Sequence, residues 1–93
     1  MKLSTLVRTA RIKRDLPLRD LADSVGVSAS FLSRIERGEH IRISSRTLTA
    51  LGAALDLSGD AVFQAAGRLP PDVEQYVLTN LPRVRRSMAV RAA

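Results

Sequence analysis

The sequence predicts an all-α protein, with a five-helix domain in residues 1–67 and a short helical extension in residues 68–93. Three observations predict this class. Apolar residues recur at spacings of three and four residues, which places them on one face of a helix. Serine, proline and glycine residues, which favour helix ends, separate these apolar stretches. No segment of useful length alternates apolar and polar residues, as a half-buried strand would.

The first helix is expected to follow Ser4-Thr5, which can cap it, and to run to about residue 13 or 14. Leu6 and Ala10 lie four residues apart and therefore share a face of this helix. The second helix is expected at about residues 18–25. Pro17 suits its start, because the missing N–H of a proline would have no partner there. Gly26 follows it, where a left-handed residue commonly ends a helix.

Serine residues precede the last three helices of the domain, where a hydroxyl oxygen can accept a hydrogen bond from a free backbone N–H. Ser28 is expected to cap a third helix at about residues 29–37. Ser45 is expected to cap a fourth helix that runs to about residue 55, and Ser58 a fifth helix at about residues 59–66. The inward apolar residues of these helices are Phe31, Leu32, Ile35, Leu48, Leu51, Ala54, Leu55, Val62 and Phe63.

The extension begins where two consecutive prolines, Pro70 and Pro71, interrupt the helical pattern. Two short helices are expected after them, at about residues 72–79 and 83–91. Val73, Val77 and Leu81 recur at every fourth position, which again indicates one apolar helix face.

Charge and composition favour a nucleic-acid partner. The 93 residues fit one compact domain, and 15 basic residues against 9 acidic residues give a net charge of +6. All but two of the basic residues are arginines, whose planar guanidinium can form paired hydrogen bonds with phosphate oxygens or a guanine edge. A small arginine-rich domain is typical of nucleic-acid binding, although ribosome-associated and membrane-surface proteins can carry the same charge.

The same composition argues against other classes of function. The absence of cysteine excludes a disulfide scaffold, a thiolate zinc site and a cysteine nucleophile. His40 is the only histidine, and no pattern pairs a serine with it, so we expect no enzyme activity, metal site or cofactor. The N-terminus does not have the pattern of a signal peptide, and no apolar run is long enough to span a membrane. We therefore expect a cytoplasmic protein without a membrane partner.

Residues 18–36 meet the requirements of two short helices joined by a tight turn. Such a pair needs a small residue where the helices touch, a glycine in the turn and an apolar residue after it. Ala22, Gly26 and Val27 meet these needs. The third helix then presents small residues near its start and basic residues near its end, a face that can enter a DNA major groove. This outward face consists of Ala29, Ser30, Ser33, Arg34 and Arg37.

Over residues 3–67 the chain resembles the lambda-repressor-like (Cro or XRE) helix-turn-helix family. The matching pieces are LVRTAR at residues 6–11, DLADSVGVSASFLSRIERGE at residues 20–39 and TLTALGAALDLS at residues 47–58. Within them, the pattern GVSxxxLSxIExG is much more specific than a generic helix pair. The resemblance implies a five-helix domain that binds double-stranded DNA and reads bases with its third helix.

The resemblance also implies, by position, which residues form the site. Arg34 leads the base-facing set, because one guanidinium can bond both O6 and N7 of a guanine. Many relatives have a polar phosphate anchor where this chain has Leu18, and Arg19 is its expected substitute. Arg11 and Glu36 match the family's structural ion pair between the first and third helices. The base-facing residues are Ala29, Ser30, Ser33 and Arg34, and the phosphate contacts are Arg19, Ser28, Arg37, His40, Arg42 and Arg46.

The extension is expected to form a homodimer contact, because members of this family commonly bind two half-sites about one helical turn apart. The expected contact residues are Val73, Tyr76, Val77, Leu81, Val84 and Met88. Two alternatives for this segment are a helix folded back on the domain and direct DNA contact by the arginines at positions 83, 85 and 86.

The leading hypothesis for function is a sequence-specific repressor that occupies its promoter as a dimer. A second hypothesis is the antitoxin of a toxin–antitoxin pair, which regulates its own promoter and binds a toxin or co-regulator protein through the extension. A third is a protein-interaction module that has lost DNA binding.

Overall fold

The computed structural model describes residues 1–80, which form six α-helices and no strand. The predicted all-α class is therefore confirmed for these residues. The expected helix at about residues 83–91 and the expected dimer contacts of Leu81, Val84 and Met88 lie outside the described residues. The helices are α1 (Leu3–Lys13), α2 (Leu18–Val25), α3 (Ala29–Glu36), α4 (Ser45–Leu55), α5 (Gly59–Ala65) and α6 (Pro71–Thr79).

The start of α1 differs from the prediction. The helix begins at Leu3, so Ser4 and Thr5 lie inside it and do not cap it, and no side chain caps this end. Leu3 is buried in the core. Full burial of a leucine side chain contributes about 1.5–3 kcal/mol, whereas a serine cap typically contributes about 1 kcal/mol. Packing of Leu3 therefore outweighs the cap signal and sets the helix start.

The cap of α4 also differs from the prediction, by one residue. Ser44, not Ser45, precedes the helix, and its Oγ accepts a hydrogen bond from the Thr47 backbone N–H at 3.1 Å. Ser45 Oγ lies 2.6 Å from Nη2 of Arg68, which donates to it. The hydroxyl predicted to cap the helix thus binds a residue that is distant in the sequence.

The other local end signals of α2, α3 and α5 act as predicted. Gly26 follows α2 with φ of +83°, a left-handed conformation that favours glycine. Ser28 Oγ accepts a hydrogen bond from the Phe31 N–H at 3.0 Å at the start of α3. Ser58 Oγ accepts one from the Ala61 N–H at 3.1 Å at the start of α5. The three helix boundaries fall within one residue of their predicted positions.

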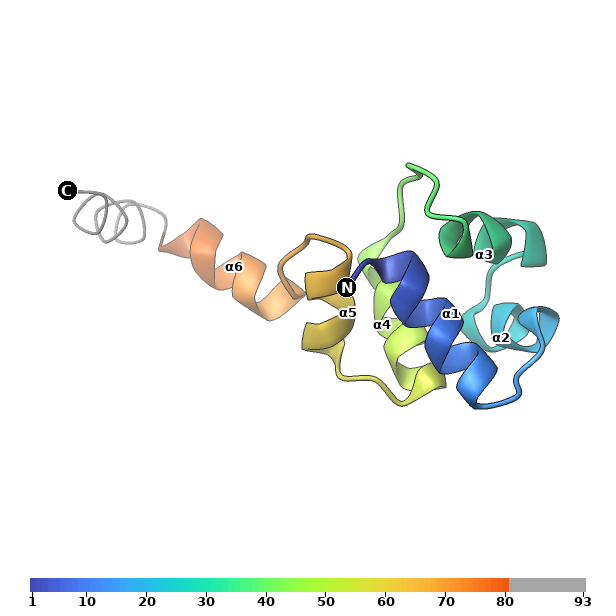
Figure 1. Cartoon of the computed structure of the whole chain (residues 1–93). Helices are drawn as coiled ribbons and strands as arrows, with labels where there is room; N and C mark the ends of the chain where they lie inside the picture. Colours follow the sequence, from blue (N-terminus) through green and yellow to red (C-terminus); the bar gives the residue numbers. More distant parts are fainter. Residues whose placement is uncertain (81–93) are drawn as a thin grey trace.

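Helices α1 to α5 share one hydrophobic core. α4 contacts α1, α2 and α5, and α3 packs against α1 and α2, as Figure 1 shows. Phe63 of α5 is the largest fully buried side chain. The core consists of Leu3, Val7, Leu21, Ala22, Leu32, Ile35, Leu48, Leu51, Leu55, Val62 and Phe63.

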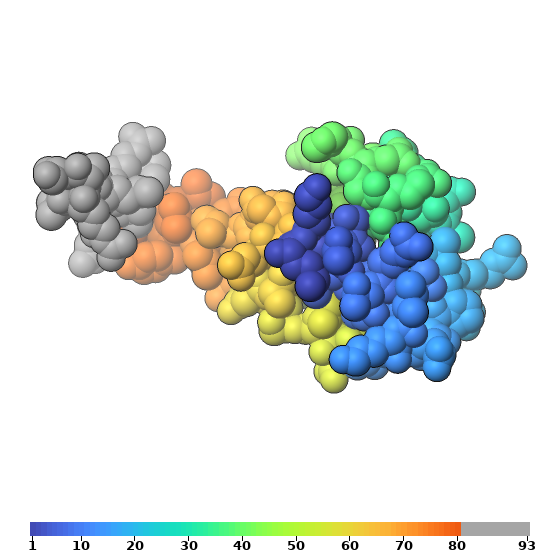
Figure 2. Space-filling view, viewed as in Figure 1, coloured from blue at the N-terminus to red at the C-terminus, as the bar shows by residue number. Residues whose placement is uncertain are grey.

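α6 stands apart from this core. No residue of α6 is buried, and its apolar residues Val73, Tyr76 and Leu78 are exposed. Figures 1 and 2 show α6 extending from the α5 end of the domain, on the side away from α2 and α3. α6 therefore contributes little to the core, and its apolar side chains are accessible among the described residues.

Candidate nucleic-acid interface

The α2–α3 unit is joined by the tight turn that the sequence predicts. Ala22 is buried where the two helices meet, and its carbonyl oxygen accepts hydrogen bonds from the N–H groups of Gly26 at 2.9 Å and Val27 at 3.0 Å. Leu32 and Ile35 bury the inner face of α3 in the core. The outer face of α3 is thereby held in a fixed orientation.

The residues of the predicted outward face of the third helix differ in exposure. Ser30, Arg34 and Arg37 are exposed, whereas Ala29 and Ser33 are half-buried. Of the four residues expected to face bases, Ser30 and Arg34 therefore offer the most accessible hydrogen-bonding groups.

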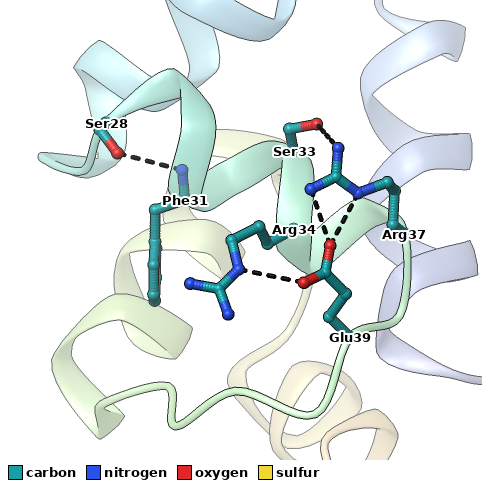
Figure 3. A network of polar contacts seen from close by, with 6 residues as sticks. All are labelled: Ser28, Phe31, Ser33, Arg34, Arg37 and Glu39. Atoms are coloured by element: carbon teal, nitrogen blue, oxygen red, sulfur yellow. Dashed lines mark hydrogen bonds and ion pairs between the residues drawn. The ribbon is translucent and has the colours of Figure 1, made fainter.

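A polar network that the sequence did not predict links the end of α3 to the following loop (Figure 3). Glu39 Oε1 accepts a hydrogen bond from Nε of Arg34 at 3.1 Å, and Glu39 Oε2 accepts one from Nε of Arg37 at 2.8 Å. Arg37 Nη2 lies 2.7 Å from the same Oε2, and Arg37 Nη1 donates to Ser33 Oγ at 3.2 Å. The two arginines of the predicted DNA-facing surface are therefore joined through one carboxylate.

The backbone turn at Gly38 brings Glu39 back toward α3. Gly38 has φ of +74°, and its N–H donates to the carbonyl of Ile35 at 3.0 Å. The Glu39 N–H donates to the carbonyl of Arg34 at 3.2 Å. Hydrogen bonds from Arg37 first, and from Arg34 second, lower the pKa of Glu39. The carboxylate is therefore ionised at neutral pH.

The expected phosphate contacts are spread along the described residues from α2 to the first turn of α4. Arg19 is exposed in the first turn of α2, and Ser28 is exposed at the start of α3 with its Oγ engaged by the helix cap. His40 and Arg42 are exposed in the loop between α3 and α4, and Arg46 is exposed in the first turn of α4. Arg37 differs from these residues because Glu39 and Ser33 engage its guanidinium.

The structure places Arg11 and Glu36 in a two-point ion pair between α1 and α3. Arg11 Nε lies 2.7 Å from Glu36 Oε2, and Arg11 Nη2 lies 3.0 Å from Glu36 Oε1. Arg11 Nη1 also donates to the carbonyl of Leu16 at 3.0 Å. The side chains are only 18% and 9% exposed, and the hydrogen bond that Arg11 donates to Glu36 raises the pKa of Arg11. One guanidinium thus joins α1, α3 and the loop before α2.

Arg68 fixes the loop between α3 and α4 against the end of α5. Its Nη1 donates to the carbonyl of Ile43, its Nη2 donates to Ser45 Oγ, and its guanidinium carbon lies 5.8 Å from the centre of the Phe63 ring. The role of Arg68 leaves no local signal in the sequence, because its partners lie 23 and 25 positions away. The basic loop residues are therefore carried on an anchored segment.

Residues 1–80 contain no group of three or more histidine, cysteine, aspartate or glutamate side chains placed to hold a metal ion. No helix within this part of the chain is long and apolar enough to cross a membrane.

Comparisons with known proteins identify the family. A family model described as a helix-turn-helix domain matches residues 2–63. Two crystal structures of the clp gene regulator ClgR from Corynebacterium glutamicum are each 34% identical to this chain. One match covers 70% of this chain and 83% of that chain with a TM-score of 0.58, and the other covers 88% and 84% with a TM-score of 0.60.

The complex of the SinR and SinI proteins is a more distant match, which shows the fold alone. It is 23% identical, covers 97% of this chain and 94% of that chain, and has a TM-score of 0.61. No curated protein matches the chain. Three observations indicate the same helix-turn-helix family: the turn between α2 and α3, the family match and the two ClgR structures. The chain belongs to the lambda-repressor-like (XRE) helix-turn-helix family and has the fold of its DNA-binding transcription regulators.

Proposed function

We propose that this protein is a sequence-specific repressor that binds double-stranded DNA as a homodimer at an operator with two half-sites. Residues 1–67 carry DNA binding in this proposal, and residues 68–93 carry assembly. Repression follows from occupancy, because a dimer bound across a promoter blocks access to it. No cofactor or catalytic step is needed for this activity.

The exposed side chain of Arg34 is the single observation that best supports sequence-specific binding. Arg34 projects from a helix whose inner face is buried through Leu32 and Ile35. Among residues 1–80, the hydrogen bonds of its side chain use only Nε. The two terminal nitrogens can therefore pair with O6 and N7 of a guanine in the major groove. Ala29, Ser30 and Ser33 complete the base-facing surface in this proposal.

The phosphate contacts are assigned to the residues that surround this surface. Basic side chains bind phosphates without regard to sequence and position the protein on the duplex, while base contacts provide the selectivity. The proposed set is Arg19, Ser28, Arg37, His40, Arg42 and Arg46.

Arg34→Ala should weaken binding to the preferred duplex by about 1–3 kcal/mol, because it removes a two-point contact to one base. Binding to a scrambled duplex should change much less. Fluorescence anisotropy measures both, with a duplex that the wild-type protein enriches from a random library and a scrambled duplex at physiological salt. Arg14→Ala is the matched control, because Arg14 is an exposed arginine paired with Asp56 at the far end of α1. Equal losses of affinity for the two duplexes would show that Arg34 contacts only phosphate.

The dimer is assigned to the apolar side chains of the extension. Val73 and Tyr76 are 39% and 59% exposed, three residues apart on α6, and Val77 of the same helix face is half-buried. A second copy of the chain can cover these side chains, and pairing two domains increases affinity for two half-sites. Leu81, Val84 and Met88 are the remaining proposed contacts of this surface.

The double variant Val73→Gln and Tyr76→Gln should convert the dimer to a monomer while leaving the domain folded. Both side chains are exposed, and glutamine is a good helix former, so the core loses no contact. Sedimentation velocity measures the oligomeric state, and circular dichroism measures the helix content. Gln75→Ala on the same helix is the control and should remain dimeric. A double variant that remains dimeric would place the interface elsewhere.

The exposed face of α6 also supports a second candidate function, in which the extension binds a different protein. An antitoxin that binds its own promoter and a toxin, or a repressor controlled by a co-regulator, would use α6 in this way. A SinR structure with a similar fold contains the SinI protein. A wild-type protein that is monomeric in sedimentation, and that still binds its enriched duplex, would favour this candidate.

A further inference from the structure

We propose that Glu39 is a positioning residue for DNA recognition. It orients Arg34 toward a base and lowers the affinity of the protein for DNA of random sequence. The proposal rests on the proposed function, because it assumes that Arg34 contacts DNA. It extends that function to a residue of the loop after α3, for which the helical pattern suggested no role.

Glu39 binds Arg34 in a way that leaves its base-reading edge available. Oε1 of Glu39 accepts a hydrogen bond from Nε of Arg34 at 3.1 Å. Figure 3 shows the two terminal nitrogens of Arg34 on the side of the guanidinium away from Glu39. These two nitrogens are the donors that match O6 and N7 of guanine. Because one edge of the guanidinium is already held, fewer rotamers are lost when the other edge binds a base.

Arg37 holds Glu39 in place for this role. It donates to Oε2 of Glu39 from Nε at 2.8 Å, and its Nη2 lies 2.7 Å from the same oxygen. Its third nitrogen, Nη1, donates to Ser33 Oγ at 3.2 Å on α3. One carboxylate oxygen of Glu39 thus binds Arg37, which fixes its position, and the other binds Arg34, the proposed base-reading residue. The Gly38 turn, with φ of +74°, gives Glu39 the position that these contacts require.

The same carboxylate reduces the charge that the end of α3 presents to DNA. Two arginines share one ionised glutamate, so the three side chains carry a net charge of +1 instead of +2. Affinity for random DNA depends on the number of phosphates that a protein neutralises. Glu39 therefore lowers binding to random DNA and favours the base contact of Arg34, and both effects raise specificity.

Glu39→Ala should separate these two effects in one set of binding measurements. Affinity for a random-library duplex should rise about fivefold at physiological salt, and the slope of log K against log salt should become about 0.9 more negative. The ratio of affinities for the enriched and random duplexes should fall about two- to fivefold, the range expected for loss of an exposed ion pair. Glu74→Ala removes the same charge from α6 and should change neither the ratio nor the slope by as much.

Base preference provides a readout that charge alone would not change. When Glu39→Ala is used to select from the same random library, preference should weaken at the base pair where Arg34→Ala also loses preference. Unchanged preference at that base pair, with an unchanged affinity ratio, would overturn the role of Glu39 and leave the proposed function standing. A wild-type protein that enriches no sequence would overturn the proposed function, and the role of Glu39 with it.

Discussion

Replacement of Phe63 by alanine is expected to lower the free energy of unfolding by about 3–5 kcal/mol. Phe63 is 2% exposed and is the largest fully buried side chain among residues 1–80. Its removal loses apolar burial and leaves a cavity that the surrounding helices fill only in part. Its ring also lies below the guanidinium of Arg68, so the anchor of the loop after α3 loses support. Urea denaturation followed by circular dichroism measures the change.

Phe31→Ala is the matched control for this prediction, because it removes the same side chain from a half-buried position on α3. Its cost in unfolding free energy should be clearly smaller, since less apolar area is lost. Phe63→Leu should cost less than Phe63→Ala, because leucine keeps the site apolar and much of its volume filled. Similar losses for Phe63→Ala and Phe31→Ala would contradict the central place of Phe63 in the core.

The sequence predicted those parts of the fold that depend on neighbouring residues. The cap of α3 by Ser28 and the left-handed turn at Gly26 involve contacts within four positions, so a local pattern specifies them. The wrong cap of α1 fails for the opposite reason, because burial of Leu3 moved the start of that helix. At α4 the neighbouring Ser44 caps the helix, and Arg68, 23 residues away, binds the hydroxyl of Ser45. Tertiary contacts of this kind leave no periodic signal in the chain.

The candidate site also has one feature that local sequence predicts and one that it does not. The exposure of Arg34 followed from the helical period, which placed it opposite the buried residues of α3. The partnership of Arg34 with Glu39 could not be deduced from that period, because it requires the backbone to reverse at Gly38. A glutamate that follows a helix-ending glycine, close after two helix arginines, is the signal that could have indicated it.

Replacement of Glu36 by glutamine is expected to lower the free energy of unfolding by about 3 kcal/mol. Glutamine keeps the size of the side chain but removes the charge that Arg11 meets at 2.7 Å and 3.0 Å. Because the two side chains are only 9% and 18% exposed, water replaces the lost partner poorly. The unpaired guanidinium of Arg11 between α1 and α3 accounts for the loss of unfolding free energy. Thermal and urea unfolding measure it, and a domain of this size should lose more than about 10 °C in Tm.

Two further variants test whether this loss arises from an unpaired buried charge. Asp56→Asn breaks the ion pair with Arg14, which spans 3.4 Å between exposed side chains, and should cost less than about 1 kcal/mol. Asparagine also tolerates the left-handed conformation of residue 56, where φ is +54°. The double variant Arg11→Met and Glu36→Leu should recover much of the stability, because apolar side chains can replace a buried ion pair. A double variant as unstable as Glu36→Gln would show that Arg11 acts mainly through its hydrogen bond to the carbonyl of Leu16.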